Sequence, residues 1–149
     1  MPSYTSVYEV QHSATDMFNL AADIQSYPEF VPLCSGMEIL SKKEEDGKEV
    51  LEARMTVSAG FVKESFTNRV VLDRDNLTIA VKALDGPFNH LTNDWAFEPL
   101  GEKSCRISFK LDYEFRSFAL RLTLGAISET AFGRYAKAFE DRADEIYGK

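Results

Sequence analysis

Polar and apolar residues alternate over much of the first 115 positions of the chain. The period of two in Tyr4–Val10 predicts a first strand. The helical spacing of the apolar residues in Met17–Ile24 predicts a helix that is capped by Ser13 or Thr15. Because two prolines follow, we expect only a short helical turn next, over Tyr27–Val31. One strand and two short helices are therefore predicted here.

Six further strands, separated by charged turns, are predicted after these helices. Asp46-Gly47 is a strong hairpin signal between the first two of them, and Gly60 predicts a turn or bulge after the second. Apolar residues occupy every second position of these segments, which is typical of strands with one buried face. The predicted strands are Met37–Lys42, Leu51–Ala59, Phe61–Leu72, Leu77–Ala83, Leu91–Phe97 and Cys105–Phe115.

The period then changes from two to 3.6, which predicts one long helix over Phe118–Tyr147. At 1.5 Å per residue this helix is about 45 Å long, enough to cover the apolar face of a sheet. We therefore predict an α+β fold in which a curved antiparallel sheet wraps around the long C-terminal helix. The apolar stripe of that helix is Leu124, Ile127, Ala131, Phe132, Tyr135, Phe139, Ala143 and Ile146.

The composition is that of an ordinary globular domain, with 44% hydrophobic and 28% charged residues among 149. This length fits a single domain over residues 1–149. Aromatic residues are plentiful, at 12%. The two cysteines (Cys34 and Cys105) and two histidines (His12 and His90) are too few and too widely spaced for a disulfide framework or a zinc site. We expect no metal.

The formal charge is −7, from 17 lysines and arginines against 24 acidic residues. This charge favours solubility and opposes binding to phosphate backbones, so DNA is not an expected partner. The N-terminus has no signal-peptide pattern, and the most apolar long stretch, Phe118–Ile127, is too short to span a bilayer. These features predict a cytoplasmic protein.

The predicted inward face of the sheet combines small, apolar and polar residues. Ala53, Ala59 and Ala83 either let the layers pack closely or leave a void, and both interpretations are open. Glu64 and Asn68 share this face with Phe66 and Val70 on one strand, and Asn93 lies beside Trp95 on another. A few polar groups in an apolar concavity are typical of a small-molecule site.

Signatures of catalysis are scarce in this sequence. It has no nucleophile elbow, no glycine-rich phosphate loop and no zinc-protease motif. We expect His12 at the surface or near a helix cap and Cys34 as a small buried residue, while His90 is a general base only if it reaches a cavity mouth. We therefore expect no enzymatic activity.

Several segments resemble the coenzyme Q-binding protein family, with the bacterial members as the better match. This family belongs to the START-like, helix-grip superfamily, also known as polyketide cyclases/dehydrases. The resemblance runs over nearly the whole chain in the right order. It lies in Tyr27-Pro28-Glu29-Phe30-Val31-Pro32-Leu33-Cys34, in Gly86-Pro87-Phe88 with Leu91, Asn93, Trp95 and Phe97, in Asp112-Tyr113-Glu114-Phe115 with Ser117, and in Phe139, Arg142-Ala143 and Tyr147-Gly148.

The resemblance implies a START-like domain with a hydrophobic tunnel between the sheet and the long helix. The tunnel would hold a polyisoprenoid such as ubiquinone, and the protein would carry this lipid in support of respiratory electron transport. It implies no cofactor beyond the bound lipid. A prenyl chain supplies affinity at about 0.8 kcal/mol per buried CH2, so few polar contacts are needed.

The residues that we expect to bind the ligand come from the inward face, the long helix and two loops. Asn68, Asn93 and Glu64 are the candidates for hydrogen bonds to a quinone head group. Residues 28–33 and 87–88 are expected to border the opening and to touch the inner membrane surface transiently. The full set is Phe30, Val31, Pro32, Leu33, Met55, Val57, Glu64, Phe66, Asn68, Pro87, Phe88, Leu91, Asn93, Trp95, Leu124, Ile127, Phe132 and Tyr135.

Two alternative functions remain open from the sequence. The same family includes proteins described as ribosome-association toxins, although a charge of −7 disfavours docking to a ribosome. A cyclase or dehydratase would need an acid/base pair in the cavity, for which Glu64 and His90 are the candidates.

Overall fold

The computed structural model describes residues 3–59 and 61–148, apart from the side chains of residues 59, 123 and 126–128. Within these ranges the chain forms a seven-stranded antiparallel sheet, two α-helices and a short 3-10 helix, η1. The elements are β1 (Ser3–Val10), α1 (Ala14–Ala22), η1 (Ile24–Glu29), β2 (Cys34–Glu45), β3 (Lys48–Ala59), β4 (Val62–Asp73), β5 (Thr78–Ala83), β6 (Phe88–Gly101), β7 (Ser104–Phe115) and α2 (Phe118–Tyr147).

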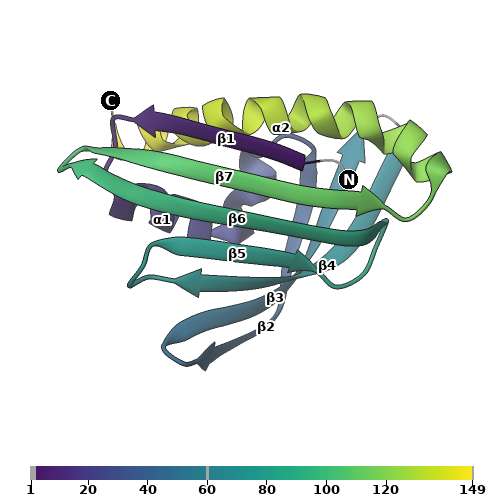
Figure 1. Cartoon of the computed structure of the whole chain (residues 1–149), viewed down its shortest axis with the longest axis horizontal. Helices are drawn as coiled ribbons and strands as arrows, with labels where there is room; N and C mark the ends of the chain where they lie inside the picture. Colours follow the sequence, from purple (N-terminus) through teal and green to yellow (C-terminus); the bar gives the residue numbers. More distant parts are fainter. Residues whose placement is uncertain (1–2, 60, 149) are drawn as a thin grey trace.

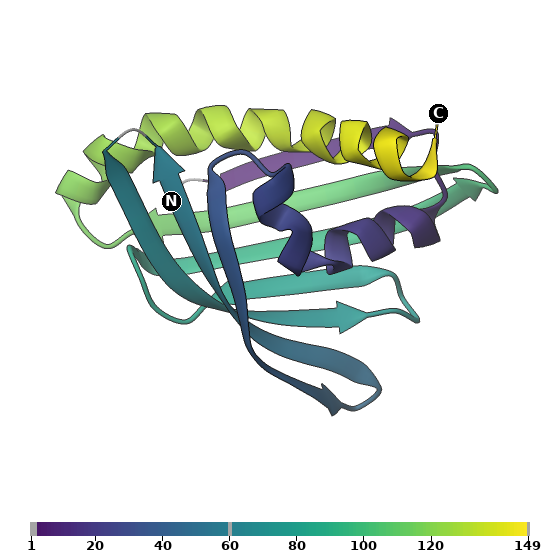
Figure 2. The same ribbon diagram turned by 180° about the vertical axis from the view of Figure 1, so that it is seen from behind.

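The strands lie in the order β1-β7-β6-β5-β4-β3-β2, so each strand after β2 pairs with the one before it and β1 closes the far edge. Figure 1 shows the curved sheet with α2 running along it, and Figure 2 shows α1 and η1 on the same side as α2. All the helices therefore cover one face. The predicted α+β fold, with two short helices after the first strand and one long C-terminal helix, is confirmed.

The alternation of apolar and polar residues explains which face is covered. In β7 every second side chain from Cys105 to Phe115 is buried, and in β3 Leu51 and Ala53 are buried while Glu52 is exposed. Because successive side chains of a strand point to opposite faces, this pattern places one apolar surface against the helices.

Local signals in the sequence determine the ends of several elements. Asp46 and Gly47 both have positive φ angles, 52° and 80°, as the tight turn between β2 and β3 requires. Ser13 caps α1 by accepting a hydrogen bond from the Asp16 amide at 3.0 Å, and Ser117 caps α2 in the same way. Gly60, where we expect a turn or bulge, lies outside the described residues.

Three boundary predictions need correction. η1 begins at Ile24, earlier than the predicted turn at Tyr27, because this turn starts directly after the end of α1. Leu77 has a φ of 53° and belongs to the turn before β5. Ile146 is exposed, because it lies in the last turn of α2, beyond the buried Ala143.

The core is closely packed at the end of the sheet that α1 covers. Phe18 of α1 packs edge-on against Phe97 of β6, with ring centroids 5.9 Å apart. Val10, Cys105 and Ile107 are fully buried in the same region. Over the other end of the sheet, α2 and η1 leave internal space, and that is where the candidate site lies.

The loop between β5 and β6 folds back onto β4 and carries Pro87 into the interior. The Asp85 carboxylate accepts a hydrogen bond from the Thr67 amide at 2.7 Å, and the Leu84 amide donates to the Thr67 carbonyl. Gly86 has a φ of 98°, and a Cβ there would lie 2.3 Å from the Cβ of Phe66. A residue with a side chain does not fit at this point.

We predict that Gly86→Ala lowers the free energy of unfolding by about 2–4 kcal/mol, because it adds a clash to a strained φ angle. Gly47→Ala is the matched control: its φ is 80°, but no atom lies within 4 Å of the new Cβ. Backbone strain alone lowers its stability by about 1 kcal/mol. Urea unfolding of both variants measures the difference, and equal losses would show that the contact with Phe66 is unimportant.

Candidate ligand-binding site

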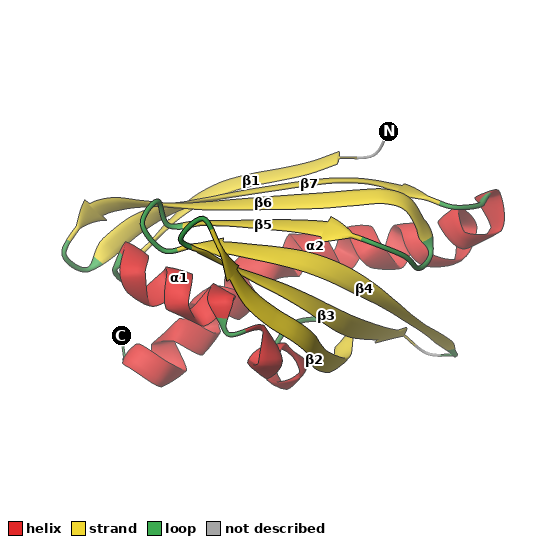
Figure 3. Ribbon diagram, turned by 90° about the horizontal axis from the view of Figure 1, so that it is seen from below, coloured by secondary structure: helices red, strands yellow, loops and turns green. Residues whose placement is uncertain are grey.

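A cavity of about 150 Å³ lies between the covered face of the sheet and α2. Figure 3 shows α2 crossing beneath the sheet, with α1 and η1 beside it. The lining side chains come from η1 and the loop after it, from β2 to β7, from the β5–β6 loop and from α2. Nearly all of them are apolar, so the interior favours an apolar guest.

Most of the predicted ligand-binding residues line this cavity. They are Val31, Leu33, Met55, Val57, Phe66, Asn68, Pro87, Phe88, Leu91, Asn93, Trp95, Leu124, Phe132 and Tyr135. The structure adds residues that the prediction omitted, namely Ile24, Tyr27, Met37, Ala53, Ser58, Val62, Val70, Ile79, Val81, Phe109, Leu111, Phe115, Ala131 and Phe139. Most of these follow the same alternation, which therefore could have identified them.

Three predicted residues do not belong to the lining. Phe30 packs edge-on against Phe139, with ring centroids 5.0 Å apart, and so lies behind the cavity wall. Pro32 is half-buried outside the lining. Glu64 is also half-buried outside it, opposite Val57 in the β3–β4 register. The side chain of Ile127 lies outside the described part of the structure.

The residues expected to border an exposed opening are mostly covered. Val31 and Pro87 are buried, and Phe30, Leu33 and Phe88 are partly buried, while Pro28 is exposed. Phe88 stacks on Phe115 at 5.1 Å. Val31, Leu33, Pro87 and Phe88 are part of the inner wall of the cavity. Phe30 packs behind that wall against Phe139 of α2.

Small residues help to leave the space empty. Ala131 lines the cavity from α2. Ala53 lines the cavity from β3. Of the two interpretations of the small residues, the void applies at Ala53, because this residue borders empty space.

Protein groups already satisfy most of the polar atoms in the lining. The Tyr27 hydroxyl donates to the Ala21 carbonyl, and Ser58 shares a 2.7 Å hydrogen bond with Ser35. Asn93 accepts from Trp95 Nε1 at 2.7 Å and donates to the Lys110 carbonyl at 3.0 Å. Asn93 therefore has a structural role in the sheet, and its expected role in binding a head group stays a prediction.

Asn68 is the exception among these polar groups. It is 5% exposed, and its Oδ1 has no hydrogen-bond partner among the described residues. A buried polar group without a partner is unfavourable, so a ligand atom is the natural complement.

The described lining contains no carboxylate, imidazole, amine or guanidinium. Its tyrosines stay neutral near pH 7, because burial raises the pKa of Tyr27 and of Tyr135 well above the usual value. His90 lies opposite Glu114 in the β6–β7 register, next to the inward-facing Leu91, and is not a lining residue. The acid/base pair required for a cyclase is thus absent from the described cavity wall.

The remaining chemically notable residues lie away from the cavity. His12 is buried directly before Ser13, the N-cap of α1, and its Nε2 lies 2.7 Å from Oδ1 of Asp144, so of its two expected positions the surface is wrong and the neighbourhood of a helix cap is right. This contact joins the β1–α1 connection to α2 across 132 positions of sequence. Burial raises the pKa of the Cys34 thiol to about 11, so that thiol is protonated and unreactive near pH 7.

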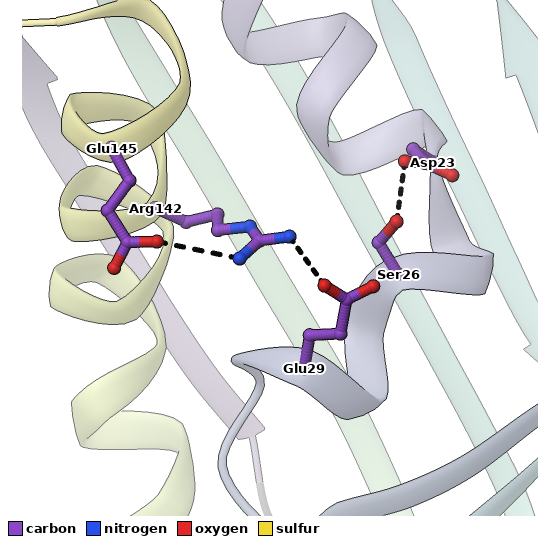
Figure 4. Close-up of polar contacts among 5 residues, drawn as sticks. All are labelled: Asp23, Ser26, Glu29, Arg142 and Glu145. Atoms are coloured by element: carbon purple, nitrogen blue, oxygen red, sulfur yellow. Dashed lines mark hydrogen bonds and ion pairs between the residues drawn. The ribbon is translucent and has the colours of Figure 1, made fainter.

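Arg142 of α2 holds η1 against the helix and so positions one wall of the cavity (Figure 4). Its guanidinium contacts Glu29 at 2.9 Å and Glu145 at 3.5 Å, and it lies 5.2 Å from the centroid of the Phe30 ring. Sequence reasoning missed this contact, because Arg142 and Glu29 are 113 positions apart.

No cluster of metal-ligating side chains occurs among the described residues. None of the described helices is long and apolar enough to cross a membrane.

Comparison with known proteins places the site in a family context. Residues 10–140 match the family described as "Polyketide cyclase / dehydrase and lipid transport". The chain is 36% identical to the ribosome association toxin RatA of Escherichia coli (strain K12) over 147 residues, covering 99% of this chain and 90% of that protein. It is 30% identical to the mitochondrial coenzyme Q-binding protein COQ10 of Dictyostelium discoideum over 142 residues, covering 94% and 68%.

A solved START superfamily protein from Mycobacterium smegmatis has the same fold, with a TM-score of 0.81, 22% identity and coverage of 97% and 98%. This likeness confirms the START-like architecture. With the family match over most of its length and relatives at 30–36% identity, the chain belongs to the polyketide cyclase/dehydrase and lipid transport family.

Proposed function

We propose that the protein binds an isoprenoid lipid, ubiquinone in the first place, in the cavity under α2 and carries it without altering it chemically. The observation that carries this proposal is an almost wholly apolar cavity whose described lining has no group able to exchange protons near pH 7. Such a site can hold a molecule by burial but has no means of general acid/base catalysis.

The size of the cavity limits which part of a ligand it holds. A volume of about 150 Å³ accommodates one benzene-sized group. A quinone ring or a short piece of prenyl chain fits, and the rest of a long tail must leave the cavity. Val57, Ser58 and Val62 extend the lining to the turn between β3 and β4, which makes that end the exit.

The family context supports this proposal. The family description includes lipid transport, and one relative is named for binding coenzyme Q. A carrier of ubiquinone at the cytoplasmic membrane would support respiratory electron transport.

We predict that affinity for quinones rises with the first one or two prenyl units and then levels off, because further units no longer enter the protein. Calorimetric titration with quinones of increasing tail length measures this, and mass spectrometry of extracts from the purified protein identifies any lipid already bound. Ala53→Leu fills the cavity and should weaken binding at least tenfold. Ala80→Leu, on the exposed face of β5, is the matched control. Absence of binding, or affinity independent of tail length, contradicts the proposal.

A carrier must also meet the membrane, and the exposed apolar residues indicate where. Phe61, in the β3–β4 turn, is fully exposed, and Phe118 and Leu122 in the first turns of α2 are 65% and 68% exposed. Figure 2 shows this turn and the start of α2 at the same end of the molecule. We propose that these side chains enter the bilayer when the protein takes up or releases lipid.

Burial of one such side chain in the bilayer favours membrane binding by about 2 kcal/mol. This raises the ratio of membrane-bound to free protein roughly 30-fold. We therefore predict that Phe61→Ser reduces sedimentation with phosphatidylcholine vesicles at least tenfold, while Val7→Ser, an exposed apolar residue on β1, leaves it unchanged. Uncharged vesicles avoid the repulsion that a net charge of −7 meets at an anionic surface. Equal losses for both variants would show that contact is not local to the β3–β4 turn.

A second candidate function is association with the ribosome, which the 36% identity to RatA favours. The net charge of −7 opposes it, because ribosomal RNA presents a dense surface of phosphates. The two candidate functions can be distinguished, because carrying a lipid requires a ligand in the cavity and ribosome association does not.

Sedimentation of the purified protein with ribosomal subunits at physiological salt separates the candidates. We expect the protein to remain at the top of the gradient, because electrostatic repulsion acts against the complex. Co-migration with a subunit that survives the Ala53→Leu substitution would favour the second candidate.

A further inference from the structure

Asn68 lies in the middle of β4, between the inward-facing Phe66 and Val70. It lines the cavity, is 95% buried and leaves its Oδ1 without a hydrogen-bond partner among the described residues. Asparagine is a poor strand residue, and an apolar side chain would suit these surroundings better. Stability therefore does not explain this amide, and a ligand does.

The neighbouring strands leave room for a ligand beside the amide. In the sheet register Asn68 stands between Ala53 of β3 and Ala83 of β5, the small residues of the inward face. The other lining amide, Asn93, is engaged by Trp95 and by the Lys110 carbonyl, and no bond joins it to Asn68. Since no described residue pairs with this oxygen, a molecule that enters the cavity is its natural partner.

Resting on the proposed function, we propose that Asn68 is the polar anchor of the site: its amide hydrogen-bonds one ring oxygen of the ligand and sets the ligand's orientation. The oxygen-bearing ring then lies at the centre of the sheet. The tail extends past Phe66 and Val62 toward the β3–β4 turn. Asn68 thus distinguishes an oxygenated head group from plain hydrocarbon of the same shape.

An amide suits such a ligand in both of its redox forms. Its oxygen accepts a hydrogen bond from a hydroxyl, and its NH2 group, after a flip of the side chain, donates one to a carbonyl. A quinone presents carbonyls and a quinol presents hydroxyls, so one asparagine binds either form. A carboxylate could not donate to the carbonyl, and an aliphatic side chain could bind neither.

Two pairs of small probes, matched in shape, test the anchor by calorimetric titration. Para-cresol carries a hydroxyl group where para-xylene carries a methyl group. Cyclohexanone carries a carbonyl oxygen where methylenecyclohexane carries a =CH2 group. Asn68→Leu replaces the amide with a larger apolar side chain of the same branching, and Asn68→Ala removes the amide without adding any bulk. Asn89→Leu, the same substitution at an exposed position of β6, is the control.

We expect the affinity ratio of the polar to the apolar probe to fall about tenfold in both Asn68 variants and to stay unchanged in Asn89→Leu. Asn68→Leu should also unfold at the same or a higher temperature than the wild type, because it removes an unsatisfied buried amide. Probes that bind with unchanged ratios in both Asn68 variants overturn the anchor and leave the proposed function standing. If neither the probes nor prenyl quinones bind the wild type, the anchor and the proposed function both fall.

Discussion

The curved sheet has more apolar surface on its covered face than its helices can fill, and the rest of the structure depends on this mismatch. At one end α1 packs closely, with Phe18 fully buried against Phe97. At the other end the small side chains of Ala53 in β3 and Ala131 in α2 line the space between the sheet and the helix. A cavity of about 150 Å³ results, without any break in the secondary structure. The cavity therefore follows from the way in which the sheet and α2 pack against each other.

The walls of this space are held by contacts that lie behind them. Arg142 ties η1 to α2 through Glu29 and through the face of the Phe30 ring. On the opposite side, Asp85 fastens the β5–β6 loop to the Thr67 amide, which brings Pro87 and Phe88 into the lining. Polar interactions at the surface thus position apolar side chains inside. This division lets the interior remain without charge while the whole chain carries −7.

Most of the polar side chains that line the cavity form hydrogen bonds with protein groups, and Asn68 is notable because its buried oxygen does not. Tyr27, Ser58 and Asn93 all bond to protein groups, while the buried Oδ1 of Asn68 does not. Because the described lining lacks ionised groups, the specificity available there comes from shape and from a few neutral polar groups, among them the Asn68 amide and the Tyr135 hydroxyl. That combination favours a ring with one or two oxygens over a charged metabolite.

The sequence by itself determined the strands, the long helix and the face of each that is buried, because periods of two and 3.6 are local properties of the chain. Extending the alternation along β4 was enough to place Asn68 inside. Only the tertiary structure decided that Asn93 is engaged by Lys110 and Trp95, that Glu64 and His90 lie off the lining, and that His12 is buried against Asp144. These outcomes depend on partners as many as 132 positions away, and on how far the twisted layers separate. No local pattern encodes those distances.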